Sequence, residues 1–181
     1  MNRLLLTDQV ARVAALLKVR GETVAIAESS TGGLIAASLL SVAGASAYFL
    51  GGSVVYTLAS RRELLRISAA DVEGLAPLSE PMARRFAAHA RTQLGATWGI
   101  AELGAAGPTG ARYGHPAGTS VLAVDGPATA SITLQTGSDD REANMWRFTA
   151  AAIELLADAL GRLDATPGGT TSEDAKLAGR T

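Results

Sequence analysis

The chain contains no cysteine among its 181 residues. This absence excludes disulfides, thiolate nucleophiles, iron–sulfur clusters and cysteine-ligated zinc. Its two histidines, His89 and His115, lie far apart in the sequence, and neither belongs to a carboxylate spacing typical of metal ligands. We therefore expect no metal site.

An excess of charge of one sign and long apolar runs are also missing. The 16 lysines and arginines nearly balance the 17 aspartates and glutamates, which leaves a net charge of −1 and no basic face for nucleic acid. Apolar runs are broken well before the ~20 residues that a membrane span needs, and no charged-then-apolar leader opens the sequence. We expect a cytoplasmic protein that binds neither nucleic acid nor membrane.

What the chain does have is enough apolar surface for one folded domain. Hydrophobic residues make up 48% of the sequence and charged residues 18%, which is typical of a compact globule. A chain of this length can bury most of that surface without disulfides or metal. From Asp164 onward the sequence becomes small and polar, so we expect a domain over residues 1–163 and a disordered tail over 164–181.

Hydrophobic spacing and turn residues predict helices that alternate with strands. Helices are expected through residues 6–20, 31–41, 61–67 (capped by Ser60), 70–75, 80–94 (started by Ser79) and 139–163. Strands are expected over 23–27, 48–56 and 98–103, followed by a hairpin of 118–124 and 128–135. This order predicts a three-layer α/β/α single domain with a mixed sheet of about five strands that includes the late hairpin.

The most informative segment is Ala27–Gly33, with the sequence Ala-Glu-Ser-Ser-Thr-Gly-Gly, which lies between a predicted strand and a predicted helix. Its two glycines let the backbone approach a ligand, and the first amides of the helix have no intrahelical partner, so the turn favours an anion or oxyanion. Ser29, Ser30 and Thr31 supply a candidate nucleophile at the same place. The alternative is that Ser30 or Thr31 only caps the helix and the glycines only permit the turn.

Two further loops favour a binding site at this turn. In open α/β sheets, ligands bind beyond the carboxyl ends of the parallel strands. Residues 29–33, 56–61 and the glycine-rich stretch 104–110 each follow a predicted strand in that way. Their coincidence favours a site over a simple helix cap.

Taken in order, these loops resemble the CinA C-terminal domain family. The family's Ala-Glu-Ser-Cys-Thr-Gly-Gly corresponds to residues 27–33, its Ala-Gly-Ser-Ser-aromatic-Phe turn to 43–49, its Gly-x-Val-x-Tyr to 52–56, its Val-Ser-Glu-Pro to 78–81, its Gly-x-Ala-Gly-Pro to 104–108, its Pro-x-Gly-Thr to 116–119, and the end of its Gly-Asp-Arg to 140–141. The resemblance covers about residues 4 to 160.

Characterised members of that family are nicotinamide mononucleotide (NMN) deamidases. The resemblance therefore implies a serine amidohydrolase that converts the NMN carboxamide to a carboxylate and releases ammonia, without metal or cofactor. It implies Ser29 as nucleophile, with Tyr56 and Ser46 in the same site, a small-molecule substrate, and a homo-oligomer. Substrate contacts are expected from the matching motif positions Thr31, Gly32, Gly33, Ser46, Gly107, Pro108 and Arg141.

The sequence departs from the family at the residue expected to act as base. Members place a lysine five residues after the tyrosine, and a buried lysine can lose its proton because desolvation lowers its pKa. Here that position is Arg61, whose guanidinium stays protonated. Arg61 could stabilise an alkoxide or hold an anionic group of the ligand, or it could be an exposed charge on a helix. Glu28 is an alternative base or a residue that orients the backbone.

Three further departures replace polar positions of the family by apolar ones: Leu58, Leu103 and Met145. Together with Arg61 they support a second hypothesis, a non-catalytic nucleotide-binding domain with a regulatory or assembly role. A third is hydrolysis of a different amide or ester in a reshaped pocket. We expect His115 to be a solvated loop residue.

Overall fold

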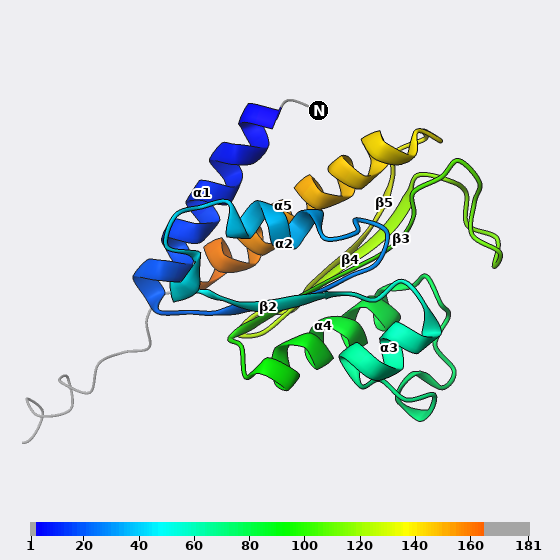
Figure 1. Cartoon of the computed structure of the whole chain (residues 1–181), viewed down its shortest axis with the longest axis horizontal. Coiled ribbons are helices and arrows are strands. Elements are labelled where there is room, and N and C mark those ends of the chain that lie inside the picture. Colours follow the sequence, from blue (N-terminus) through cyan, green and yellow to red (C-terminus); the bar gives the residue numbers. More distant parts are fainter. Residues whose placement is uncertain (1–2, 165–181) are drawn as a thin grey trace, which may run out of the picture.

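The computed structural model describes residues 3–164, so the tail predicted over 164–181 lies almost entirely outside the described residues (Figure 1). The elements in chain order are α1 (Arg3–Arg20), β1 (Val24–Glu28), α2 (Leu34–Leu40), the 3-10 turn η1 (Ala45–Ala47), β2 (Phe49–Val54), α3 (Leu58–Leu65), the 3-10 turn η2 (Ala70–Val72), α4 (Glu80–Leu94), β3 (Trp98–Ala105), β4 (Thr119–Asp125), β5 (Ala130–Gln135) and α5 (Arg141–Asp164).

The sheet has the strand order β2-β1-β3-β4-β5. Strand β1 pairs in parallel with β2 on one side and with β3 on the other, whereas β3, β4 and β5 pair antiparallel. The predicted α/β class, the mixed sheet and the late hairpin are confirmed. Because β1, β2 and β3 run in one direction, the loops that follow them meet at one edge of the sheet.

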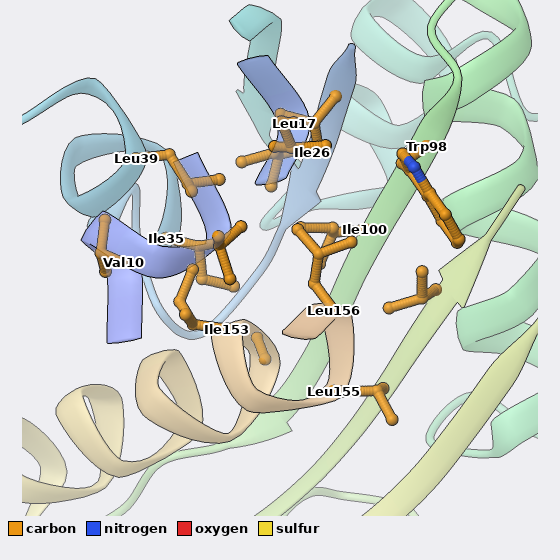
Figure 2. Packing of buried hydrophobic residues seen from close by; sticks show 14 of the residues in the cluster. Val10, Leu17, Ile26, Ile35, Leu39, Trp98, Ile100, Ile153, Leu155 and Leu156 are labelled. Carbon is orange, nitrogen blue, oxygen red and sulfur yellow. The ribbon is translucent and has the colours of Figure 1, made fainter. Parts of the chain in front are cut away.

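Helices cover both faces of the sheet and bury two separate apolar layers (Figure 1). Helices α1, α2 and α5 pack on one face, where Ile26 and Ile100 of the sheet meet Ile35 of α2 and Leu156 of α5 (Figure 2). Helices α3 and α4 pack on the other face, against small residues of the strands that include Ala101. Since side chains alternate along a strand, adjacent residues face different layers.

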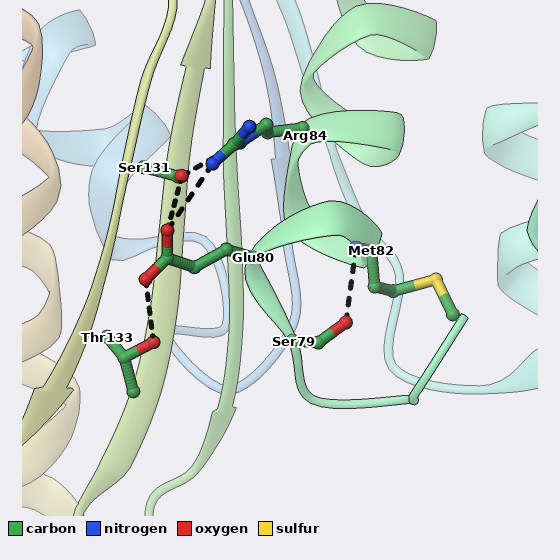
Figure 3. Close-up of polar contacts among 6 residues, drawn as sticks. All are labelled: Ser79, Glu80, Met82, Arg84, Ser131 and Thr133. Carbon is green, nitrogen blue, oxygen red and sulfur yellow. Dashed lines mark hydrogen bonds and ion pairs between the residues drawn. The ribbon is translucent and has the colours of Figure 1, made fainter.

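Helix α4 begins where the sequence predicts and is tied to the edge strand β5 (Figure 3). The Ser79 hydroxyl accepts the amide of Met82 at 3.4 Å and caps the helix. The Glu80 carboxylate accepts hydrogen bonds from Ser131 at 2.6 Å and Thr133 at 3.1 Å, both on β5. These bonds, the one from Ser131 most of all, hold the pKa of Glu80 below its usual value.

Four helices start elsewhere than predicted. Helix α1 begins at Arg3 and not at 6, and helix α5 begins at Arg141 and not at 139. Helix α2 begins at Leu34 and not at 31, because Gly32 and Gly33 have φ of 65° and 104°, outside the helical region. Helix α3 begins at Leu58 and not at 61, because Thr57 and not Ser60 is the cap: its hydroxyl accepts the Ser60 amide at 3.1 Å, and the Ser60 hydroxyl accepts the Thr57 amide at 2.8 Å.

Smaller differences concern the ends of two further elements. The helix predicted over 70–75 is only the short 3-10 turn η2, and β3 continues to Ala105, two residues into the predicted loop 104–110. Strand β3 is therefore long enough to carry its last residues to the edge where the predicted loops meet.

Candidate functional site

The turn between β1 and α2 is held from inside the protein by the carboxylate of Glu28. This side chain is 1% exposed and accepts hydrogen bonds from the amides of Gly33 (3.0 Å), Ile35 (3.0 Å) and Ala36 (2.8 Å), and from the Thr31 hydroxyl (2.8 Å). A carboxylate beside the first amides of a helix is the stabilising arrangement. Glu28 therefore orients the backbone, and the simple cap by Ser30 or Thr31 is wrong, since neither side chain caps α2.

A second buried carboxylate, Glu102 of β3, holds the same turn from the neighbouring strand. One oxygen accepts the amides of Ser29 (3.1 Å) and Thr31 (3.0 Å), and the other accepts the hydroxyls of Ser30 (2.5 Å) and Ser120 (3.2 Å). Burial raises the pKa of Glu102 above its usual value, although the hydrogen bonds, led by that from Ser30, oppose the shift. Sequence reasoning missed this residue; a lone glutamate within the apolar run Trp98–Leu103 was the available signal.

These contacts correct one expectation about the turn. The sequence predicts that amides of this turn bind an anion or oxyanion, but the amides of Ser29, Thr31 and Gly33 each donate to a glutamate of the same chain. The negative charge that the turn attracts is therefore supplied from within, by Glu28 and Glu102.

Both glutamates lie on the face of the sheet covered by α1, α2 and α5. Their strand neighbours Ala27 and Ala101 belong to the apolar layer under α3 and α4, and alternation turns the next side chain to the opposite face. Ser120, which donates to Glu102, lies in β4 next to Val121, which belongs to that same layer under α3 and α4. The carboxylates therefore support the turn from the side opposite to α3 and α4.

A cleft of about 850 Å³ opens at this edge of the sheet, on the side of α3 and α4. All three predicted loops contribute to its wall, with Ser29 and Ser30 from the first, Tyr56, Thr57, Leu58 and Arg61 from the second, and Gly104–Gly107, Thr109 and Gly110 from the third. Ser29 and Tyr56 follow paired ends of parallel strands, because the Val55 amide donates to the Glu28 carbonyl at 2.6 Å. The structure thus brings Ser29, Tyr56, Arg61, Gly107 and Arg141 to one cleft.

Arg141, in the first turn of α5, connects two of the loops. Its guanidinium donates to the Gly107 carbonyl at 2.8 Å and to the Tyr56 hydroxyl at 3.3 Å. Tyr56 is 60% exposed, so its ring stands at the mouth of the cleft rather than in the core. Arg141 is therefore held at the cleft wall by contacts that leave its other N–H groups for a ligand.

Arg61 differs from Arg141 in having no partner. Its Nε is buried without a hydrogen bond, and no hydrogen bond or ion pair joins its guanidinium to another residue in the described range 3–164. A third arginine, Arg112, also lines the cleft, and the lining residues include no aspartate or glutamate. The cleft is therefore a cationic site, suited to an anionic ligand.

Several predicted contact residues are not among those that line this cleft. Thr31 is fully buried between the two glutamates, Gly32 and Gly33 turn the backbone toward α2, and Pro108 is exposed after its cis peptide bond with Gly107. Ser46 lies in η1, before the start of β2, whereas the cleft lies beyond the end of β2. Within one chain, Ser46 and Ser29 are thus at opposite ends of the sheet.

The residues that depart from the family pattern divide between the cleft and its surroundings. Leu58, 74% exposed, and the buried Leu103 line the cleft, whereas Met145 lies beside Gly32. His115 is half-buried outside the cleft, with its ring edge-on to Tyr113 at 6.2 Å. The cleft wall thus combines arginines with apolar side chains.

Residues 3–164 contain neither a candidate metal site nor a candidate membrane-spanning helix. The described part of the chain contains no group of three or more histidine, aspartate or glutamate side chains placed to hold a metal ion. None of its described helices is long and apolar enough to cross a membrane.

Comparison with known proteins agrees with this architecture. The model of the CinA C-terminal domain matches residues 6–160. A CinA-like protein of Anaeromyxobacter dehalogenans strain 2CP-C is 41% identical over 148 residues, which is 82% of this chain and 36% of that protein. A CinA-like protein of Acaryochloris marina is 45% identical over 124 residues, 68% of this chain and 30% of that protein. The chain thus spans about a third of the length of these relatives.

Solved structures share the fold along most of the chain. A CinA superfamily protein of Klebsiella pneumoniae 700603 superposes with a TM-score of 0.81 at 29% identity, over 90% of this chain and 99% of that one. The competence/damage inducible protein CihA of Agrobacterium tumefaciens gives 0.79 at 28% identity, over 86% and 95%. On its sequence, its sheet topology and these matches, the chain belongs to the CinA C-terminal domain family.

Proposed function

We propose that the cleft hydrolyses the carboxamide of NMN to nicotinate mononucleotide and ammonia, with Ser29 as the nucleophile. One observation carries the proposal: Ser29 leaves β1 on a turn fixed by two buried glutamates, and it lines a cleft with three arginines and no acid. A fixed turn presents a hydroxyl in a constant position, which favours reaction. The arginines suit the phosphate of a nucleotide.

The chemistry proceeds in two steps. Ser29 Oγ attacks the carboxamide carbon and forms an ester bond while its proton is passed on; the C–N bond then breaks, and the nitrogen takes up a proton and leaves as ammonia. Water attacks the ester, the bond to Oγ breaks, and the product leaves as a carboxylate. Overall, one water is consumed for each amide bond.

In this proposal Arg61 stabilises negative charge and does not act as base. Its guanidinium keeps its proton, so it can donate to the oxyanion that forms on the carboxamide oxygen. The Tyr56 hydroxyl, oriented by Arg141 at 3.3 Å, can relay the serine proton to water. Since the described residues place no hydrogen-bonded base on the Ser29 hydroxyl, we expect slow turnover.

The proposal includes a homo-oligomer. Ser46 lies at the end of the sheet opposite to the cleft of its own chain, so it can join a site in that cleft only when a second copy brings it there. Light scattering gives the oligomeric state of the chain directly.

The test is release of ammonia and nicotinate mononucleotide from NMN by the purified chain. Ser29→Ala should abolish formation of both products. The matched control is Ser41→Ala, an exposed serine at the C-terminal end of α2, which should leave the rate unchanged. Hydrolysis that persists in Ser29→Ala would contradict the assignment of the nucleophile. Binding of NMN without turnover would instead support the second hypothesis, a non-catalytic nucleotide-binding domain.

A further inference from the structure

Among the described residues, the guanidinium of Arg61 has no hydrogen-bond acceptor although its Nε is buried, which distinguishes it from Arg62 and Arg141. Arg62, the next residue of α3, pairs with Glu63 at 2.7 Å, and Arg141 donates to Gly107 and Tyr56. The buried Nε of Arg61 has no hydrogen-bond partner. A buried donor left unsatisfied is costly, so this arrangement favours a ligand that supplies acceptors.

The two arginines come from different walls of the cleft. Arg61 belongs to α3, which follows β2, whereas Arg141 belongs to α5 and is fixed to the loop after β3. Apolar side chains, among them Val55, Leu103 and Phe86, complete the wall. Such a cleft can hold an apolar ring together with two separate anionic groups.

A carboxylate satisfies Arg61 better than a carboxamide does. A guanidinium has only donors, and a carboxylate can accept two parallel hydrogen bonds from it. A carboxamide offers one acceptor oxygen and turns its NH₂ donors toward the donors of the arginine. The pair with the carboxylate is also the stronger one, because both partners are charged. No acid among the lining residues competes for the arginine.

We propose that the cleft takes a nucleotide with two anionic groups, a phosphomonoester and a ring carboxylate, and that Arg61 holds the carboxylate. The inference rests on the proposed function for the choice of nucleotide. It means that the acid product, nicotinate mononucleotide, binds more tightly than the amide substrate NMN. The enzyme is then inhibited by its own product.

Calorimetric titration of both nucleotides into the Ser29→Ala chain, which removes the proposed nucleophile, tests the inference. We expect nicotinate mononucleotide to bind about tenfold more tightly than NMN. Arg61→Gln should lower the affinity for nicotinate mononucleotide by about tenfold. It should change the affinity for NMN by less than about twofold. Arg62→Gln, the exposed neighbour, is the matched control and should change neither affinity. Arg141→Gln should lower the affinities for both nucleotides by a similar factor.

The outcomes separate this inference from the proposed function. Equal affinities for acid and amide, or an equal loss of both in Arg61→Gln, overturn the inference even if the unmodified chain hydrolyses NMN. The chain could bind nicotinate mononucleotide more tightly than NMN through Arg61 and yet release no ammonia from NMN. That result would support the inference and contradict the proposed hydrolase activity. Failure of both nucleotides to bind overturns the inference as well.

Discussion

The carboxylate of Glu102 accepts the hydroxyl of Ser30 at 2.5 Å, a bond between strand β3 and the turn that follows β1. Through the same side chain the amides of Ser29 and Thr31 are tied to β3. The candidate nucleophile is therefore positioned by a residue more than 70 positions away in sequence, on the neighbouring strand of the sheet.

Replacing this carboxylate should loosen the turn. In Glu102→Gln one acceptor oxygen is replaced by an NH₂ group, which faces the amide and hydroxyl donors that now bind the carboxylate. We therefore expect the free energy of unfolding to fall by about 2 to 4 kcal/mol. If the chain hydrolyses NMN, kcat should fall while KM changes little, because Glu102 does not line the cleft. Urea denaturation and steady-state kinetics measure the two effects. Glu154→Gln, an exposed glutamate on α5, is the control, and a Glu102 variant as stable as that control would contradict the prediction.

The raised pKa of Glu102 predicts how stability depends on pH. Because the folded state holds the proton more tightly than the unfolded chain, the contribution of this group is fully present below the unfolded value near 4.5 and is lost as the pH rises through the folded pKa. The free energy of unfolding of the native chain minus that of Glu102→Gln should therefore decrease with rising pH, measured from about pH 4.5 to about pH 8. Taking the difference cancels the pH-dependent contributions of other groups to the free energy of unfolding. One such group is Glu80, whose pKa is shifted in the opposite direction. A difference that is constant or rises with pH would refute the assignment.

Gly104 leaves the space that the Ser30 hydroxyl and Glu102 occupy. A methyl group there would overlap both Ser30 Oγ and Glu102 Oε1 and would lie 3.2 Å from the ring of Phe148. We expect Gly104→Ala to destabilise the fold by about 1 to 3 kcal/mol, because it forces the network apart. Gly161→Ala in α5, where a methyl meets nothing within 4 Å, should instead be neutral or stabilising by up to about 1 kcal/mol. Thermal unfolding of the two variants measures this difference in stability. Equal unfolding midpoints would contradict the prediction that the contact between Ser30 and Glu102 needs a glycine at position 104.

Arg61→Lys should introduce the base that the cleft lacks. A lysine in the half-buried position of Arg61 can lose its proton, which the guanidinium cannot. We expect the rate of NMN hydrolysis to rise by at least about tenfold and to increase with pH as the amine deprotonates. Ammonia release over a pH series measures the effect, with Arg62→Lys as the control on the same helix. A rate that stays the same would mean that the cleft lacks more than a base.

The sequence predicts best those elements whose signals are local. The serine before α4 and the glycine after it, and the turn Asp125-Gly126-Pro127 between β4 and β5, mark boundaries that the structure reproduces within a few residues. The start of α3 was misplaced because Thr57 and Ser60 cap each other, so both residues carry the same signal. Choosing between them depends on where β2 ends, which is a property of the sheet.

The site was predictable as a set of loops and less so as a set of contacts. Parallel pairing of β1, β2 and β3 brings the three predicted loops to one cleft, as the order of the elements implied. The partners of the turn amides could not be predicted, because Glu102 reaches them from a distant part of the sequence. The position of Ser46 was predictable from the strand direction alone, since Ser46 precedes β2 and Tyr56 follows it.

The residues that hold the turn after β1 and the residues that shape the cleft lie on opposite faces of the same sheet. Glu28 and Glu102 hold the turn from the side of α2 and α5, while Leu58, Arg61 and Leu103 shape the cleft on the other side. None of these three side chains is among the hydrogen-bond partners of the two glutamates in the described structure. Substitutions of the exposed Leu58 or of Arg61 can therefore alter what the cleft binds while the turn stays supported, whereas Leu103 is itself part of the buried layer under α3 and α4.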